Sequence, residues 1–429
     1  MRLFNIISIF IVGITLISCQ QNKKTITNSK DYSEYLQNDD KKTTKEAEQR
    51  LQFWNKKIKK DSIQISAMAP AAEAYSQLFQ SSGDIKYLKL AEKLLTKSAK
   101  VAAIKKEGYL LALARNYISQ HRFSEAMKAA EAAFMLHPNK ASKMVLFDVS
   151  MELGDYTKAQ KYLEQITNHS DYNFLIRLAK WSDYKGNLDA TIRYMEKAKD
   201  IAERSKKKSL MLWSYTNLAD YYGHAGRIKE SYEHYLRALQ IDPSNAYAKK
   251  GIAWIVYSYE YNPKEALRII DAVTKTYKSP DYFLLKAEIA EFQKDGAIKK
   301  AYLKKYTNAV QDQRYGKMYN AYNAKILAEE YEDYDKALQI ANEEVDSRPT
   351  PESYDLLAYI YYLKGEKEKA LSIAMEYIVN KTYEPEANYH IAEIYKANGL
   401  TEKVDPLKKE LIESGYELGP ITLEKIKNL

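Results

Sequence analysis

The sequence predicts an all-α protein, built as an α-solenoid of about ten antiparallel helix pairs. Gly (14) and Pro (10) are scarce in a chain of 429 residues, which argues against the many turns of an all-β fold. Hydrophobic residues make up 45% and charged residues 29%, as in an ordered, water-soluble body. The third and most informative observation is a repeat: one set of small, apolar and turn residues recurs at fixed offsets along most of the chain.

The first 18 residues have the features of an export signal. Arg2 opens an apolar run that ends at Ile17. This run is shorter than the roughly 20 apolar residues that cross a bilayer, and it has the proportions of a secretory signal. The sequence Leu-Ile-Ser-Cys then ends at Cys19, the only cysteine of the chain. These residues resemble the lipobox of bacterial lipoproteins, which implies cleavage before Cys19 and lipid attachment to its sulfur.

The lipobox implies a lipid-anchored protein of the bacterial cell envelope. Several acyl chains on Cys19 would make a stable anchor, because one chain alone binds a membrane only marginally. Gln20 stands where an aspartate would favour the inner membrane, so we expect the outer membrane. Whether the body faces the periplasm or the exterior stays open. Residues 19–42 are polar and poor in apolar side chains, so we expect a flexible tether there.

The segment 43–68 is expected to form an N-terminal capping helix region. Thr43 and Glu46 have the spacing of a capping box, in which each side chain satisfies a backbone group at the start of a helix. The apolar residues that follow share one helix face: Ala47, Leu51, Trp54 and Ile58.

The clearest copy of the recurrent pattern runs from Leu113 to Pro138. Ala114 and Ala126 are small where two helices must approach closely, and Pro138 ends the unit because it cannot continue the second helix. This pattern resembles the tetratricopeptide repeat, a helix pair with a period of 34 residues. Ten such repeats fit residues 69–415, and we expect residues 416–429 to form a C-terminal cap.

The resemblance also implies where a partner would bind. The first helices of such repeats line the concave side of the solenoid, and positions i, i+4 and i+7 form one stripe on each. The expected partner-binding residues are Arg115, Asp148, Lys180, Asp183, Asp220, Lys250, Trp254, Tyr257, Tyr322, Tyr359, Tyr362 and Tyr389. In the later repeats this stripe is aromatic. Its rings either form a groove for an extended peptide or a sugar, or they only fill contacts between helices.

No set of residues points to catalysis. The sequence has no Gly-rich phosphate loop and no HExxH, CxxC or GxSxG motif. None of the six histidines is paired with another at metal-ligand spacing. The net charge of +9 is modest and scattered, and no nucleic-acid-binding module accompanies it. We therefore expect no enzymatic activity, no cofactor, no metal and no nucleic-acid partner.

The function that these features favour is a non-catalytic, membrane-anchored scaffold. It would bind protein or peptide partners in the cell envelope. The alternative is an outer-membrane lipoprotein that binds a glycan or nutrient beside a transporter. The sequence leaves the identity of the partner and the oligomeric state open.

Overall fold

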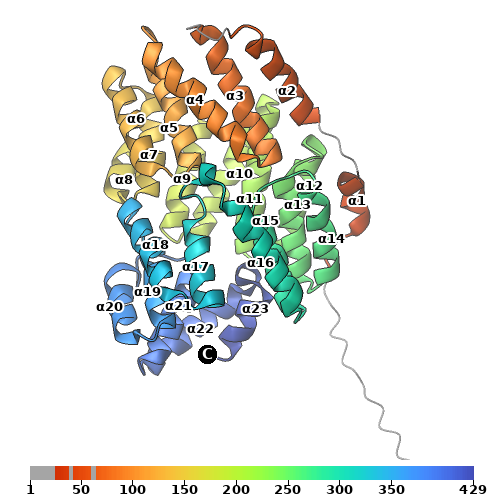
Figure 1. Cartoon of the computed structure of the whole chain (residues 1–429), viewed down its shortest axis with the longest axis vertical. Helices are drawn as coiled ribbons and strands as arrows, with labels where there is room; N and C mark the ends of the chain where they lie inside the picture. The colour runs from red at the N-terminus through yellow and green to blue at the C-terminus, as the bar shows by residue number, and fades with distance from the viewer. Residues whose placement is uncertain (1–24, 38–41, 59–63) are drawn as a thin grey trace, which may run out of the picture.

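The computed structural model describes residues 25–37, 42–58 and 64–429, and this part of the chain contains 23 α-helices and no strand. The expected signal peptide and Cys19 lie outside it. Successive helices pack in ten adjacent pairs, which confirms the predicted solenoid of about ten helix pairs (Figure 1). In the described part, no helix combines the length and the apolar character that crossing a bilayer requires.

The first six pairs are α3 (Ile65–Ser82) with α4 (Ile85–Val101), α5 (Lys106–Ser119) with α6 (Phe123–Leu136), α7 (Lys140–Glu152) with α8 (Tyr156–Glu164), α9 (Tyr172–Tyr184) with α10 (Leu188–Ser205), α11 (Lys208–His224) with α12 (Ile228–Ile241), and α13 (Ala246–Trp254) with α14 (Pro263–Thr274). A π-helical segment, η1 (Ile255–Tyr259), extends α13. The last four pairs are α15 (Asp281–Phe292) with α16 (Gly296–Val310), α17 (Asn320–Tyr331) with α18 (Tyr334–Ser347), α19 (Pro351–Leu363) with α20 (Lys367–Tyr377), and α21 (Pro385–Ala397) with α22 (Val404–Glu413).

Local chemistry sets the turn within each pair. Gly186 and Gly226 follow the first helix with φ near +70°, a conformation that glycine adopts without steric cost. Asn187 and Asp155 then begin second helices, because their side chains accept hydrogen bonds from the backbone N–H groups of the first helical turn. Alanine occupies the helix crossings, and the side chains of Ala114 and Ala126 are completely buried.

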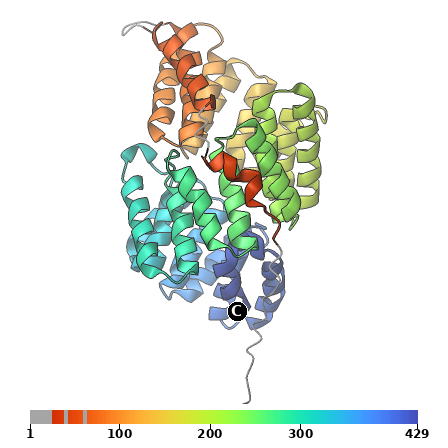
Figure 2. The same cartoon turned by 90° about the vertical axis from the view of Figure 1, so that its right-hand side faces the viewer.

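The solenoid winds so tightly that its successive turns touch. The Lys278 N–H, just before the seventh pair, donates to the Ser82 carbonyl in the first pair at 2.8 Å. In the same way, Gly154 of the third pair lies against Pro349 before the ninth, and Gly186 of the fourth pair lies against Tyr383 before the tenth. In these three places, the turn within a pair meets the start of the pair six places later, so one superhelical turn takes about six pairs. Figure 2 shows the later helices lying beneath the early ones.

This winding leaves two free edges. We call the first rim the edge formed by the connections between early pairs, such as residues 102–105 and 206–207. We call the last rim the opposite edge, formed by the turns within later pairs, such as residues 225–227, 260–262 and 293–295. In Figure 1 the early helices α3 to α6 lie at the top of the molecule and α19 to α23 at the bottom.

The flexible tether expected over residues 19–42 is wrong for residues 25–37. Residues Ser29–Gln37 form helix α1, which packs on α12 and α14 (Figure 2). Its Tyr32 side chain is 1% exposed and belongs to the main hydrophobic core, so burial of this ring holds a segment that is otherwise polar.

The two ends of the array carry further helices. Helix α2 (Lys42–Asn55) packs on α3 and begins one residue before the expected start, whereas the side chain of Thr43 lies outside the description. At the other end, the residues expected to form a cap lie mostly in α23 (Gly415–Lys427). This helix packs on α22 and also reaches η1 and α11, so it continues the stacking of one superhelical turn on another.

Candidate ligand-binding site

The expected partner-binding residues lie on first helices, where many of their polar groups pair with a neighbouring repeat. Asp148 accepts a hydrogen bond from Arg177 at 2.6 Å, and Lys180 forms an ion pair with Glu152 at 2.7 Å. Further along, Lys250 forms an ion pair with Asp281 at 2.9 Å. Asp220 accepts hydrogen bonds from Tyr247, at 2.7 Å, and from Tyr235. These groups therefore join adjacent first helices.

Part of this inner face is covered by helix α23. The indole N–H of Trp254 donates to the Tyr416 carbonyl at 3.1 Å, and the Ser258 hydroxyl donates to the same oxygen at 2.6 Å. His224 Nδ1 lies 2.8 Å from Glu417 Oε2. The chain's own C-terminal helix thus occupies the surface over α11 and η1 that a partner was expected to reach.

The charges around His224 shift its pKa strongly. Burial alone lowers the pKa of His224, but the hydrogen bond and charge of Glu417, with the charges of Asp220 and Asp183, raise it to about 9. Burial raises the pKa of Asp183, partly offset by the charge of His224. Burial, and then Glu417, raise the pKa of Glu384 to about 7. A protonated imidazole therefore holds a cluster of carboxylates together.

Of the two alternatives for the aromatic stripe of the later repeats, a groove does not fit three of its tyrosines, because they are buried. The side chain of Tyr257 is completely buried, between Trp254 and Phe292. Tyr359 is 6% exposed, and its ring stacks on His390 with centroids 3.7 Å apart. The third, Tyr389, is also buried. These rings fill contacts between helices, which was the structural alternative for the stripe.

Three other expected residues keep accessible surface. Arg115 and Tyr322 are exposed, and Tyr362 is half-buried with its hydroxyl donating to Glu393 at 3.0 Å. Burial raises the pKa of Tyr322 although 49% of its surface is exposed, because protein surrounds the inner face closely. These residues lie on different helices, and no pocket described for this structure includes them.

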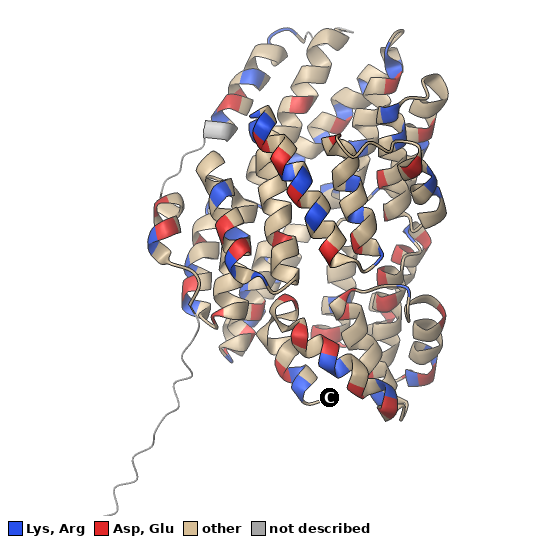
Figure 3. Cartoon of the chain, turned by 180° about the vertical axis from the view of Figure 1, so that it is seen from behind, with Lys and Arg blue, Asp and Glu red and all other residues tan. Residues whose placement is uncertain are grey.

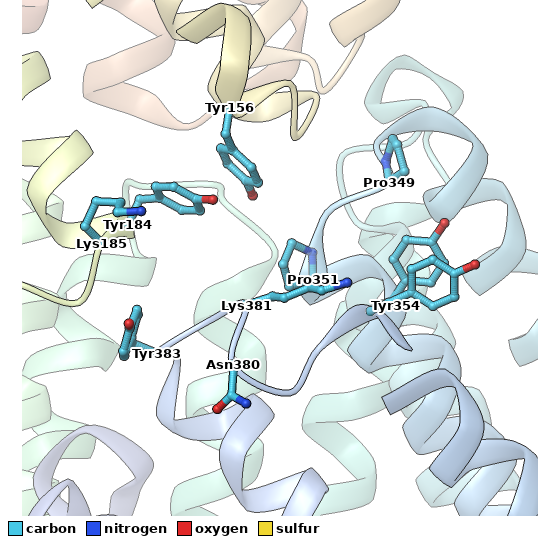
Figure 4. A pocket seen from close by; sticks show the side chains of 10 residues that line it. Tyr156, Tyr184, Lys185, Pro349, Pro351, Tyr354, Asn380, Lys381 and Tyr383 are labelled. Atoms are coloured by element: carbon cyan, nitrogen blue, oxygen red, sulfur yellow. The ribbon is translucent and has the colours of Figure 1, made fainter. Parts of the chain in front are cut away.

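A pocket of about 290 Å³ lies instead at the seam between two superhelical turns. We call it the tyrosine pocket, and its lining residues are Tyr156, Tyr184, Lys185, Pro349, Pro351, Tyr354, Tyr377, Asn380, Lys381 and Tyr383. The third and fourth pairs contribute one wall, and the segments around α19 and α20 contribute the other. Figure 4 shows Tyr156 and Tyr184 on one side of the opening and Tyr354 on the opposite side.

Ring stacking gives the tyrosine pocket flat walls. The rings of Tyr156 and Tyr184 stack with centroids 3.9 Å apart and an interplanar angle of 20°. The rings of Tyr354 and Tyr377 stack at 3.8 Å and 6°. Tyr383 is 63% exposed beside them. Such rings offer apolar faces with polar edges, a combination common in recognition surfaces.

Two lysines give the tyrosine pocket a positive charge. The Lys185 ammonium lies 5.7 Å from the centre of the Tyr184 ring, and the Lys381 ammonium lies 5.7 Å from that of Tyr377. Lys381 also donates to the Glu376 carbonyl oxygen, and neither lysine forms an ion pair with a described carboxylate. Two carboxylates act on the tyrosines of the pocket: the charge of Glu352 adds to burial in raising the pKa of Tyr184, and a hydrogen bond of Glu376 raises the pKa of Tyr377. The two lysines are thus available to an anionic ligand group.

Sequence reasoning missed this pocket because its walls come from pairs six places apart. The repeat pattern predicts which residues of a pair face each other and which face the adjacent pairs. It does not predict contacts between distant pairs. The excess of tyrosine over phenylalanine, 38 against 10, is the only sequence signal that bears on it, and it does not locate the site.

Charge elsewhere on the molecule is mixed. In the view of Figure 3, Lys and Arg are interspersed with Asp and Glu, and neither sign gathers on one part of the molecule. Within residues 25–37, 42–58 and 64–429, no group of three or more His, Cys, Asp or Glu side chains has an arrangement that could hold a metal ion.

A scan against known families matches residues 174–244 to the tetratricopeptide repeat. This range spans α9 to α12, the fourth and fifth helix pairs. No curated protein matches the chain.

Several solved structures are similar. A tetratricopeptide repeat protein from Parabacteroides merdae ATCC 43184 is 18% identical, covering 55% of this chain and 93% of that one, with a TM-score of 0.39. A human IFIT1 dimer with m7Gppp-AAAA is 15% identical over 72% of this chain and 70% of that one, with a TM-score of 0.46. A Rap protein complexed with Competence and Sporulation Factor is 13% identical over 66% and 98%, with a TM-score of 0.41.

Proposed function

We propose that this chain, which matches the tetratricopeptide repeat over residues 174–244, is a lipid-anchored scaffold of the bacterial cell envelope. It binds a protein partner through an extended, acidic segment and performs no chemistry on it. The tyrosine pocket is the observation that carries the proposal. The lipobox at Cys19 supports the anchor, and Gln20 favours the outer membrane.

The chemistry of the pocket suits such a segment. Stacked rings and two prolines accept apolar side chains, while the ammonium groups of Lys185 and Lys381 attract a carboxylate. An extended peptide presents both kinds of group at close spacing, and it can follow the seam between the superhelical turns. A glycan could also stack on these rings, so an oligosaccharide panel belongs in the test.

Peptide binding is tested with a displayed library and then with fluorescence polarisation of the selected peptides. Selected peptides should be enriched in Asp or Glu next to apolar residues. The double substitution Lys185→Ala with Lys381→Ala should weaken binding about tenfold or more, equivalent to about 1.4 kcal/mol. Lys105→Ala, on an exposed lysine of the first rim, is the matched control and should leave affinity unchanged.

Two results would count against this function. Peptide binding that ignores both lysines would place the partner elsewhere. Binding of a neutral oligosaccharide, lost in Tyr383→Ala, would favour the nutrient-binding alternative instead.

The anchor has a separate test. Bacteria that express the full chain and receive a labelled fatty acid should incorporate the label, and the protein should be recovered with the outer membrane. Cys19→Ser should lose both the label and the membrane association, because cysteine sulfur is the attachment point. A labelled Cys19→Ser protein would exclude this anchor.

A further inference from the structure

The segment that precedes the repeats is fixed to the body almost from its first described residue. The backbone N–H groups of Ile26 and Thr27 donate to Glu260 Oε1 at 2.7 and 2.6 Å, and the Thr27 hydroxyl donates to Glu260 Oε2 at 2.9 Å. Tyr32 donates to Glu265 at 2.8 Å from its buried ring. Glu260 is itself 4% exposed, so these bonds lie largely out of water.

This attachment shortens the tether sharply. A tether of residues 19–42 would leave the body free to turn in any direction. With Ile26 fixed, only six residue steps separate Cys19 from Thr25, and they can span about 20 Å at most. An anchored body therefore has to keep the surface around Ile26 close to the bilayer.

That surface belongs to the last rim. Glu260 lies in the turn within the sixth pair, beside Tyr261, whose ring is 38% exposed. Lys229, Lys264 and Lys294 are exposed along the same rim, and none of the three forms an ion pair with a described carboxylate. Each lysine near an anionic membrane surface adds about 1 kcal/mol of attraction, and tyrosine side chains suit the interface.

We propose that the last rim faces the phospholipid bilayer and that the first rim points away from it. This orientation rests on the lipid anchor at Cys19 proposed above. It follows from the short reach of the chain, and the lysines reinforce it. The tyrosine pocket then opens at the side of the body, where the membrane does not cover it.

The orientation can be measured without cellular lipidation, because Cys19 is the only thiol. The chain from Cys19 onward is coupled to a maleimide lipid in vesicles of phosphatidylcholine and phosphatidylglycerol. Lysines are then acetylated, and their rates are read by mass spectrometry against the uncoupled, thiol-capped protein. Lys229, Lys264 and Lys294 should react about threefold or more slowly on vesicles, whereas Lys105 and Lys206 of the first rim should not change.

A variant with about twelve Gly and Ser residues inserted after Lys24 is the control, since a flexible linker of this length frees the body. Its last-rim lysines should react at rates close to those of the uncoupled protein. Equal slowing of both rims, or slowing that survives the insertion, would overturn the proposal. Absence of fatty-acid labelling in cells would contradict the proposed lipid anchor, but it would not change the acetylation rates measured on vesicles.

Discussion

Single side chains join the superhelical turns, and His224 is one whose charge depends on pH. It lies at the end of α11 and pairs with Glu417 of α23. Asp183, Asp220 and Glu384 also act on this group of charges. The pair therefore links the fifth helix pair to the C-terminal helix.

We expect this link to weaken at high pH. The folded pKa of His224, about 9, lies above its ordinary value of 6.5, so its stabilisation is complete below pH 6.5 and is lost as pH rises through 9. Because 42% of the side chain is exposed, solvent screening limits the effect to about 1 kcal/mol.

The measurement is urea unfolding of the wild type and of Glu417→Gln. The difference in unfolding free energy should be largest near pH 6 and close to zero near pH 10. A difference that is the same at both pH values would show that the pair acts through packing and not through charge.

Two glycines allow the seam contact to be isolated. Gly186 and Gly226 have φ of +71° and +69°, so alanine at either position costs about 1 kcal/mol of backbone strain. A Cβ on Gly186 would lie 2.7 Å from ring carbons of Tyr383, whereas a Cβ on Gly226 meets nothing within 4 Å.

Gly186→Ala should therefore destabilise the protein by about 1–2 kcal/mol more than Gly226→Ala. Adding Tyr383→Ala to each should remove most of this excess, as thermal or urea unfolding of the four variants would show. Equal losses for the two glycine variants would mean that Tyr383 moves aside freely.

At the scale of elements, α1 is a short helix held by one buried ring. Tyr32→Ala should remove about 3 kcal/mol of packing free energy. The remaining contacts of this nine-residue helix should be too weak to hold it on the body. Trypsin cleavage after Lys30 should then become fast while the helical circular dichroism of the body is retained. Glu34→Ala, at an exposed position of the same helix, should leave cleavage slow. Slow cleavage in both variants would show that the hydrogen bonds to Glu260 hold this segment on the body without the Tyr32 ring.

Helices could be predicted from the sequence where their own residues determine the packing and the turns. The alanines at helix crossings and the turn glycines define each pair, so the solenoid and its number of pairs follow from the sequence. Helix α1 did not follow, because its composition is that of a tether. Tyr32 is buried in the core, and Ile26, Tyr35 and Leu36 pack against it. The hydrogen-bond partners of this segment, Glu265 and Glu260, lie more than two hundred residues further along the chain.

At the scale of the whole molecule, contact between turns changes how the array unfolds. In an open solenoid each repeat touches only its neighbours, and distant repeats can melt separately. Here Lys278 of the later turn bonds to Ser82 and to Asp84 of the first pair. Early and late pairs therefore support one another.

We expect a single unfolding transition in urea. Tryptophan fluorescence, which reports mainly on the fourth to sixth pairs, and far-ultraviolet circular dichroism, which reports on all helices, should give coincident curves. A helical signal that persists after the fluorescence change would show that the turns unfold independently.

The candidate site is formed by two superhelical turns that lie far apart in the sequence, which explains why sequence reasoning missed it. The stripe of first-helix residues was expected to line a concave, partner-binding face, but large rings such as Tyr257 and Tyr359 are buried between helices. The tyrosine pocket depends on the pitch of the winding, which brings Tyr156 opposite Tyr354. Pitch is the sum of small rotations over six pairs, and no single repeat encodes it.

The same pitch restricts how this gene could change by recombination. An open array can gain or lose a whole repeat at little cost, because every junction resembles the next. Here an added pair between the fourth and the tenth would shift the later partners by one place, so Gly186 would no longer meet Tyr383. The winding therefore fixes the number of repeats between these contacts, and relatives of different length should differ by pairs added before the first pair or after the last one.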